Sequence, residues 1–246
     1  MNRMLVGTLL FALSLSCVAQ EQAAYWVVGN NDLDVLNNEY MQAYKVKNTA
    51  VAREKCLKIL QLCPTYIHAI YNLACAEAML GHKEEAFAQL KRAVELRQGW
   101  DNTAHLKGDS DLVSLHEDKR WPEIVKKSEE NEHVRNVLKE IYTAKTAGNF
   151  VLALQKCDEY QKLDPLEDLT NYRAPALAMT GRKDEALALI EKRVNDMPRA
   201  RGSMSGWLLN EKAFASLKTD KRFQDLLAKA LATEKSWSIP EARRTR

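Results

Sequence analysis

The chain repeats itself with a period of about 100 residues, so its fold must be one that can occur twice in succession. The octapeptide SLHEDKRW at 114–121 recurs as SLKTDKRF at 216–223, an offset of 102 residues. Further matches follow in the same order at offsets of 100 or 101: Lys55-Cys56 with Lys156-Cys157, Pro64 with Pro165, Tyr71 with Tyr172, and Glu85-Ala86 with Glu185-Ala186. An ordered series with so little drift is not expected by chance. The chain is therefore an approximate duplication.

Composition favours a helical fold for each copy. Only 9 glycines and 6 prolines occur in 246 residues, too few for a many-stranded sandwich or barrel, which needs a turn signal about every 8–12 residues. Apolar residues make up 46% and charged residues 28%, which is ordinary for a globular protein and excludes a disordered or fibrous chain. The 36 basic and 33 acidic side chains give a net charge of +3, too small and too scattered for a nucleic-acid-binding surface.

Within each copy, a shorter period indicates pairs of helices. Ala52 and Ala86 lie 34 residues apart, and Gly81 separates two helical patterns in the segment 65–97. The apolar positions of these patterns are Ile67, Ile70, Leu73 and Ala74, then Ala86, Leu90, Ala93 and Val94. Their spacing is that of one face of a helix, and glycine is favoured just after a helix ends. The segment therefore predicts two helices joined by a turn at Gly81.

This pattern resembles the tetratricopeptide repeat, a helix–turn–helix unit of about 34 residues with small side chains where its helices touch. With Gly81 at the turn, Leu73 and Ala74 take the positions of the family's Leu-Gly pair. Ala86 and Ala93 take the positions of its two alanines. The resemblance covers residues 33–100 and 134–200 and is strongest in the second unit.

The resemblance implies an all-α fold, a helix–turn–helix repeat superhelix with two repeat pairs that are each closed by a short helical cap. The third unit is marked by Gly148, Ala153 and Pro165, and the fourth by Gly181, Ala186 and Pro198. The chain departs from the family at Gln98, a proline position, and at Arg193, an alanine position. We expect the halves to be 20–128 and 129–246, joined near 126–132. An ordinary helical bundle without a superhelical groove is the alternative.

Each repeat pair is followed by the duplicated Ser-Leu-x-x-Asp-Lys-Arg-aromatic segment. It resembles the cap that closes groups of tetratricopeptide repeats in exported bacterial proteins, and a repeat stack needs such a cap over its last apolar face. The expected buried faces are Leu112, Leu115, Trp121, Ile124 and Val125, then Phe214, Leu217, Phe223, Leu226 and Leu227. Asp118 and Asp220 are expected to cap the helices that follow them, and Asp109 the short helix before Asp118. Arg120 and Arg222 are expected to be stacked or salt-bridged structural residues.

The amino-terminal residues form a separate segment. Arg3 precedes an apolar run at 4–15, and Cys17-Val18-Ala19 places small residues before a cleavage point. The pattern is typical of a secretory signal peptide at 1–19, so we expect a periplasmic or secreted protein whose mature chain has no transmembrane segment. A lipoprotein held at the membrane surface through Cys17 is the alternative.

The remaining cysteines form no metal or disulfide framework. Cys56, Cys63, Cys75 and Cys157 contain no Cys-x-x-Cys pair, and their spacing matches no zinc pattern. We expect them to be small buried residues, with a single disulfide as the alternative. The acidic residues between 109 and 118 lack a calcium-binding loop, and the five histidines form no metal-ligand pair. We therefore expect no metal or cofactor.

These features favour an interaction module over an enzyme. The sequence contains no nucleophile motif or phosphate-binding loop. His68 and Cys75 are about 10 Å apart along a helix, too far for a thiolate–imidazole pair. The resemblance implies binding of a protein or peptide partner on the concave surface of the repeats. The alternative is a helical-repeat enzyme or an accessory subunit of an exported hydrolase.

In the family, the first helix of each repeat lines the concave surface at set positions. Carried across, these are Asn37, Met41, Tyr44, His68, Tyr71, Cys75, Met79, Leu138, Tyr142, Lys145, Asn171 and Met179. Tyr71 is expected to point partly into the groove, although several of these side chains are core residues in the alternative interpretation. Pro175 falls inside the first helix of the fourth unit and is expected to kink it.

Overall fold

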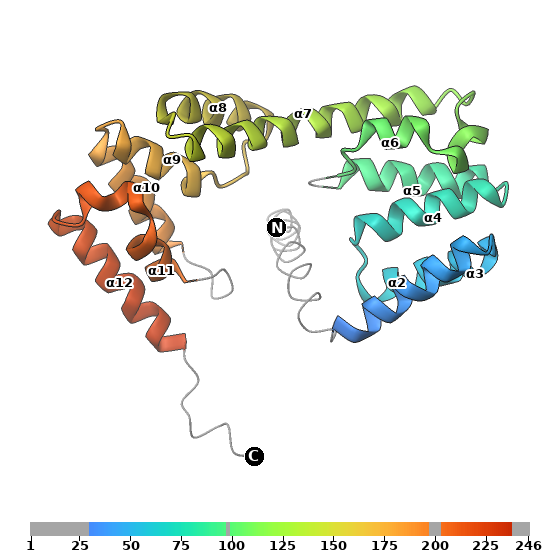
Figure 1. Cartoon of the computed structure of the whole chain (residues 1–246), viewed down its shortest axis with the longest axis horizontal. Helices are drawn as coiled ribbons and strands as arrows, with labels where there is room; N and C mark the ends of the chain where they lie inside the picture. Colours follow the sequence, from blue (N-terminus) through green and yellow to red (C-terminus); the bar gives the residue numbers. More distant parts are fainter. Residues whose placement is uncertain (1–29, 97–98, 197–202, 238–246) are drawn as a thin grey trace, which may run out of the picture. The chain divides into compact units, whose positions relative to one another are not determined.

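The computed structural model describes residues 30–96, 99–196 and 203–237, and every regular element in these ranges is a helix (Figure 1). The all-α fold expected from the sequence is therefore confirmed. None of the helices in these ranges is both long enough and apolar enough to cross a membrane. The expected signal peptide at 1–19, with Cys17, lies outside the described residues, as does Gln98.

The described part of the chain divides into two compact units, with the division between Arg135 and Asn136. The division falls inside helix α7 (Trp121–Thr146), which supplies the last helix of the first unit and the first helix of the second. The junction expected near 126–132 lies in the same helix. That the halves 20–128 and 129–246 are separate domains stays a prediction.

Within the described residues, the first unit contains four longer helices and two short ones before α7. They are α2 (Asn30–Lys45), α3 (Thr49–Leu62), α4 (Ile67–Met79), α5 (Lys83–Glu95), α6 (Thr103–Gly108) and the 3₁₀ helix η1 (Ser110–Leu115). Helix α2 packs on α3, α3 on α4, and α4 on α5, which is the packing order of a helical repeat. Figure 1 shows the pair α2–α3 in blue beside the pair α4–α5 in teal.

The second unit has the same order of elements. After the end of α7 come α8 (Phe150–Leu163), α9 (Thr170–Met179), α10 (Lys183–Asn195), α11 (Met204–Asn210), the 3₁₀ helix η2 (Lys212–Leu217) and α12 (Lys221–Trp237). Helix α8 packs on α9, and α9 on α10. The duplication seen in the sequence is therefore a duplication of structure.

Four turns inside the helix pairs share one geometry. Lys47, Gly81, Gly148 and Gly181 have φ angles of 56°, 81°, 75° and 82°. In each turn the N–H of the next residue donates to a carbonyl five residues earlier at 2.9 Å. This is the Schellman arrangement, which ends a helix through one left-handed residue, usually glycine. The shared geometry identifies α2–α3, α4–α5, α7–α8 and α9–α10 as four equivalent units.

Fully buried alanines lie in the core of the helix pairs. Ala74 on α4 and Ala86 on α5 are 0% exposed, as are Ala174 on α9 and Ala186 on α10. Short side chains at these positions let two helix axes approach to about 8–10 Å. The alanines that carried the repeat pattern in the sequence therefore have the packing role expected of them.

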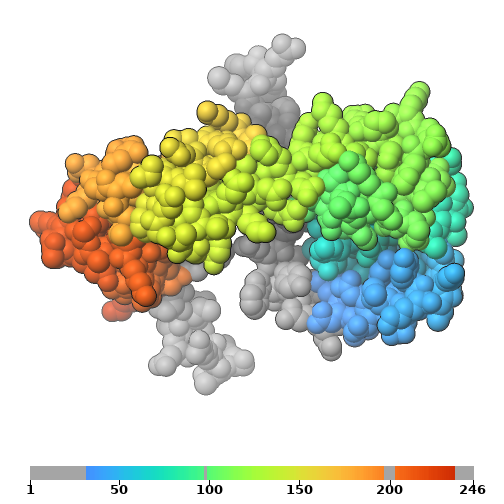
Figure 2. Space-filling view, turned by 45° about the horizontal axis from the view of Figure 1, so that its top comes forward, coloured from blue at the N-terminus to red at the C-terminus, as the bar shows by residue number. Residues whose placement is uncertain are grey.

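The cap segments are buried as expected, and they cover an unexpected face. Leu112, Leu115, Trp121, Ile124, Phe214, Leu217, Phe223 and Leu226 are at most 9% exposed, and Val125 and Leu227 are partly buried against them. Helix η1 packs against α4, and η2 packs against α9. Figure 2 shows the green residues of the first cap packed against teal residues of its own unit. Each cap therefore covers the first helix of a repeat, the helix expected to line a groove.

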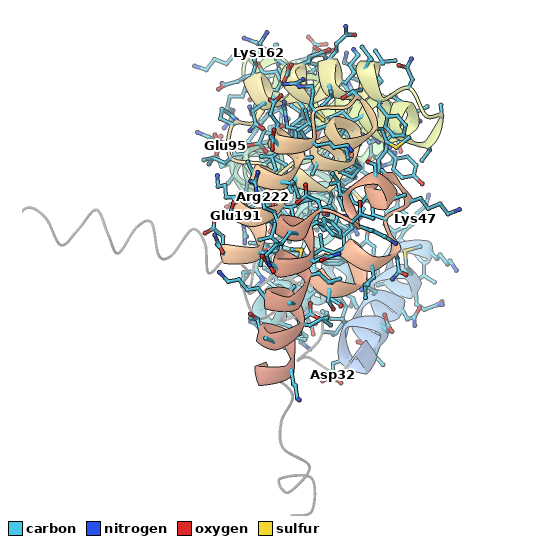
Figure 3. The ribbon with its side chains drawn as sticks, turned by 90° about the vertical axis from the view of Figure 1, so that its left-hand side faces the viewer. Asp32, Lys47, Glu95, Lys162, Glu191 and Arg222 are labelled. Carbon is cyan, nitrogen blue, oxygen red and sulfur yellow. The ribbon has the colours of Figure 1, made fainter. Side chains whose placement is uncertain are left out.

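The two duplicated arginines are structural, as expected. Arg120 lies 4.0 Å above the centre of the Phe87 ring and 2.8 Å from the Asp118 carboxylate. Hydrogen bonds from Arg120 hold the pKa of Asp118 well below its usual range. Asp118 also accepts the Arg120 backbone N–H at 3.0 Å, where α7 begins. In the second unit Arg222 lies 3.8 Å from Glu191, and Figure 3 shows both side chains at the surface.

The four described cysteines are free thiols in buried positions, as expected, and no disulfide joins them. Burial raises the pKa of Cys56 to about 12 and that of Cys157 to about 11. Both thiols are therefore neutral at physiological pH and pack as small apolar groups.

Replacing Ala86 by leucine is expected to destabilise the first unit by about 1–3 kcal/mol, because a larger side chain overpacks a closed contact. The matched control is Ala88→Leu on the exposed face of the same helix, which should change the free energy of unfolding by less than about 0.5 kcal/mol. Urea unfolding followed by circular dichroism measures both changes. Equal effects would show that α5 does not pack through Ala86.

Candidate functional site

The positions carried across from the family groove differ in exposure. Exposed or half-buried are Asn37, Met41, Tyr44, His68, Met79, Leu138, Tyr142, Lys145, Asn171 and Met179. Tyr71 and Cys75 are buried, with 2% and 4% of their surface exposed. The expectation that Tyr71 points into an open groove is therefore wrong. Partner binding by the exposed positions stays a prediction.

A part of the first cap, which we call the covering segment (residues 99–111), buries Tyr71 and Cys75. The Trp100 ring stacks on the Tyr71 ring, with centroids 3.7 Å apart and planes 5° apart. The Tyr71 hydroxyl donates to Asp109 Oδ2 at 2.8 Å, and Cys75 Sγ lies 3.6 Å from the same oxygen. Aromatic stacking and a hydrogen bond to a carboxylate both add to the stability gained by burial. The covering segment thus occupies the face of α4 that was expected to be open.

Local hydrogen bonds shape the covering segment. Asn102 caps α6 by accepting the His105 N–H at 3.1 Å, and Asp109 caps η1 by accepting the Asp111 N–H at 3.0 Å. The Trp100 indole N–H donates to the Asn102 carbonyl at 3.2 Å. Two helix starts so close together turn the chain back over α4. They also bring the carboxylates of Asp109 and Asp111 toward α4 and α2, respectively.

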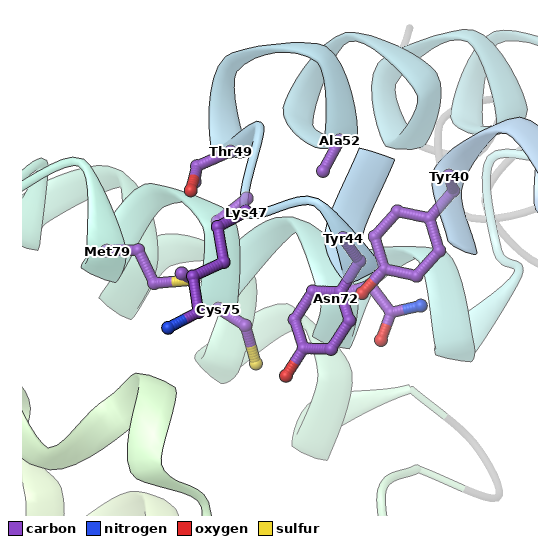
Figure 4. A pocket seen from close by; sticks show the side chains of 9 residues that line it. Tyr40, Tyr44, Lys47, Thr49, Ala52, Asn72, Cys75 and Met79 are labelled. Carbon is purple, nitrogen blue, oxygen red and sulfur yellow. The ribbon is translucent and has the colours of Figure 1, made fainter. Parts of the chain in front are cut away.

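Beside the covering segment, a shallow groove lies between α2 and α4, and we call it the α2–α4 groove (Figure 4). On α2 the rings of Tyr40 and Tyr44 stack with centroids 6.0 Å apart. Cys75 and Met79 line the groove from α4, and Lys47 from the turn. The free volume is about 10 Å³, enough for roughly one water molecule and too small for a substrate.

Tyrosine hydroxyls link the acids of the covering segment to the repeat helices. The Tyr44 hydroxyl donates to Asp111 Oδ2 at 3.0 Å, and this hydrogen bond is the main cause that raises the pKa of Tyr44 to about 12. Burial, together with the Cys75 thiol and Asp109, raises the pKa of Tyr71 far above its usual range. Both hydroxyls are therefore neutral hydrogen-bond donors at physiological pH.

Cys75, Asp109 and Asp111 have donor atoms within 4.8 Å of one another, a spacing that could hold a metal ion. Their hydrogen bonds leave few oxygens for an ion, because both oxygens of Asp109 and Oδ2 of Asp111 already accept hydrogen bonds. Burial and the two nearby carboxylates raise the pKa of the Cys75 thiol far above its usual range. Metal binding and nucleophilic attack both need the thiolate. The cluster therefore fits neither a metal centre nor an activated nucleophile.

In the second unit, a lysine takes the place of Tyr44 in the duplicated pattern. Lys145 Nζ lies 2.7 Å from Glu211 Oε2, and Glu211 caps η2. The same Nζ donates to the Asn171 carbonyl at 3.2 Å. Pro175 lies inside α9, as expected, and has no N–H to offer the carbonyl four residues earlier. Lys145 therefore has two roles. It forms an ion pair with Glu211 of the cap, and it donates a hydrogen bond to the Asn171 carbonyl, which lacks its usual helical donor because of Pro175.

Two larger hollows of the first unit lie elsewhere. One, of about 520 Å³, lies between α5 and α7 and is lined by Phe87, Val94 and Ile124 with charged residues of both signs. The other, of about 610 Å³, is an open depression between α2 and α3. No motif in the sequence indicated either hollow, and the mixed charges of the first do not select a ligand of one charge. No sequence motif indicated Trp100 either, because only the folded chain creates its contact with Tyr71.

Replacing Tyr71 by alanine is expected to destabilise the first unit by about 3–5 kcal/mol, because it removes a buried ring and the partner of Trp100. The control is Met79→Ala on the same helix; its side chain is 42% exposed, so the change should cost less than about 1 kcal/mol. Urea unfolding measures both. Equal costs would mean that the Tyr71 ring does not hold the covering segment in place.

Comparisons with known proteins add little to this geometry. No protein-family model and no curated protein matches the chain. Among solved structures, the chain is similar to the crystal structure of the P58(IPK) TPR domain at 15% sequence identity, over 90% of this chain and 70% of that chain, with a TM-score of 0.32. A likeness at that score carries no argument. The helical-repeat fold rests on the packing order and the four equivalent turns of the chain itself.

Proposed function

We propose that the chain is a non-catalytic interaction module that binds a protein or a peptide segment through the first helices of its repeats. The observation that carries the proposal is a group of exposed side chains beside the α2–α4 groove. Met41 is 45% exposed, Tyr44 41% and Met79 42%. Methionine and tyrosine are adaptable contact residues that are enriched at protein interfaces.

The second unit supports the proposal because it repeats this exposure. Tyr142 on α7 stands at the position of Met41 and is 59% exposed. Met179 on α9 stands at the position of Met79 and is 51% exposed. In a duplicated fold, core positions recur as buried residues. The recurrence of large exposed side chains at equivalent positions indicates a surface with a common use.

The proposed surface is narrower than a full concave repeat surface. The covering segment occupies Tyr71 and Cys75, so the middle of α4 is closed to a partner. A partner would instead contact α2 and the C-terminal end of α4, where Tyr44 and Met79 border the α2–α4 groove. The chemistry of the groove supports binding over catalysis, since burial keeps the Cys75 thiol neutral.

Site-specific photo-crosslinking tests the proposal. Benzoylphenylalanine in place of Met41 should crosslink a partner in an extract of the source cells. The yield should fall roughly tenfold when Tyr44 and Met79 are changed to alanine, the effect expected of binding hot spots. The same crosslinker in place of Leu57, a 37% exposed residue on α3, is the matched control and should not capture this partner. Equal capture from both positions, or none from position 41, would contradict the proposal.

We further propose that the chain is exported and acts in the periplasm or outside the cell. Its support is the amino-terminal pattern alone, in which Arg3 precedes an apolar run and Cys17-Val18-Ala19. A fusion of residues 1–30 to a reporter enzyme active only outside the cytoplasm should be active and proteolytically shortened. The fusion with Leu9 and Leu10 changed to aspartate is the inactive control. Cytoplasmic retention of the uncleaved fusion would refute export, and lipid attached to Cys17 would identify a lipoprotein.

A further inference from the structure

The acid of the cap is paired with a cation in the second unit but not in the first. In the second unit Lys145 Nζ lies 2.7 Å from the Glu211 carboxylate. In the first unit the position of Lys145 holds Tyr44, a neutral donor, and the position of Ala213 holds a further acid, Asp111. At equivalent positions, the second unit thus has one acid, Glu211, paired with a lysine, whereas the first unit has two acids, Asp109 and Asp111, and no lysine.

Within the described residues, no lysine or arginine forms an ion pair with Asp109 or Asp111. Asp111 accepts the Tyr44 hydroxyl through Oδ2, and its Oδ1 accepts no hydrogen bond from these residues. Among the described residues, His105 Nε2 lies 3.6 Å from Asp109 Oδ2, and Lys47 borders the groove. Among the described residues, the carboxylates of Asp109 and Asp111 are therefore held by tyrosine hydroxyls, without a lysine or arginine partner.

The surroundings of these acids favour a cation. The Asp109 side chain is only 11% exposed, so water screens its charge poorly. A positive charge close to two such carboxylates lowers their mutual repulsion. The Tyr44 ring, 41% exposed and stacked on Tyr40, also offers an aromatic face, which attracts an ammonium or guanidinium group.

We infer that Asp111 and the exposed Tyr44 ring, at the outer edge of the α2–α4 groove, bind a cationic side chain, arginine or lysine, of a peptide segment of the partner, which takes the role that Lys145 has in the second unit. The cationic group donates to Asp111 Oδ1 and lies against the Tyr44 ring. Apolar residues beside it in the peptide contact Met41 and Met79. The inference rests on the proposed function and gives its partner a chemical class, a basic segment with apolar flanks.

The sharpest test introduces the lysine of the second unit into the first. Tyr44→Lys places an ammonium group beside Asp111, as Lys145 lies beside Glu211, and should close the site to an outside cation while the fold is kept. Asp111→Asn keeps the shape of the side chain and removes its charge. Asp34→Asn, an exposed acid on the same helix, is the matched control. Circular dichroism and the unfolding midpoint verify that each variant is folded.

The probe is a random dodecapeptide library displayed on phage and selected on the full wild-type chain. Selected peptides should share an arginine or lysine with apolar neighbours. A synthetic copy with citrulline for that arginine, or acetyl-lysine for that lysine, should bind roughly tenfold more weakly, as expected for the loss of a charge-assisted hydrogen bond. Tyr44→Lys and Asp111→Asn should weaken binding of the basic peptide by a similar factor, and Asp34→Asn should leave its affinity unchanged.

Several results would overturn the inference. Selected peptides without a shared basic residue, or affinities insensitive to Asp111→Asn, would do so and leave the proposed interaction module standing. A selection that yields no binder would overturn it as well, whereas the crosslinking from position 41 alone decides the proposed function. If Zn²⁺ or Ca²⁺ displaces the basic peptide from the wild-type chain but not from Asp111→Asn, the acids form a metal site, and the inference is wrong.

Discussion

The stack of Trp100 on Tyr71 is the contact on which the accessible surface of the first unit depends. The centroids of the two rings lie 3.7 Å apart. The Tyr71 hydroxyl donates a hydrogen bond to Asp109, the residue that follows α6. These two contacts hold the covering segment against α4. Once it lies there, Cys75 is buried, and the carboxylates of Asp111 and Asp109 contact Tyr44 and Cys75, which line the α2–α4 groove. The cap therefore covers the last apolar face of the repeats and also determines which side chains and charges the surface of the first unit exposes.

The two units share one fold but differ in charge where the cap contacts the repeat helices. In the second unit, Pro175 deprives the Asn171 carbonyl of its helical donor, and Lys145 provides one while it pairs with Glu211. In the first unit, Cys75 stands at the position of Pro175 and has its own N–H. No donor is missing there, so a tyrosine suffices on the neighbouring helix. The duplication kept the packing and let the charge diverge.

Local chemistry made much of the fold predictable from the sequence. Gly81, Gly148 and Gly181 end helices because glycine adopts positive φ without steric cost, and the turn at each of them was read from this residue type. Lys47 adopts the same conformation without being glycine, so the first turn had no such signal. The buried faces of both caps were also predictable, because apolar residues at helical spacing need only a neighbouring surface to pack against.

The sequence by itself determined the duplication, the helix pairs, the alanine contacts and the buried side of each cap, because these depend on residue type and on spacing within a few helical turns. The tertiary structure alone decided which groove positions stay exposed. Tyr44 meets Asp111 across 67 residues of chain, and Tyr71 meets Asp109 across 38. No periodicity encodes such contacts, because they arise only when the covering segment folds back over α4. The covering segment lies over Tyr71 and does not cover Met79, so one side chain of α4 is buried and the other is exposed.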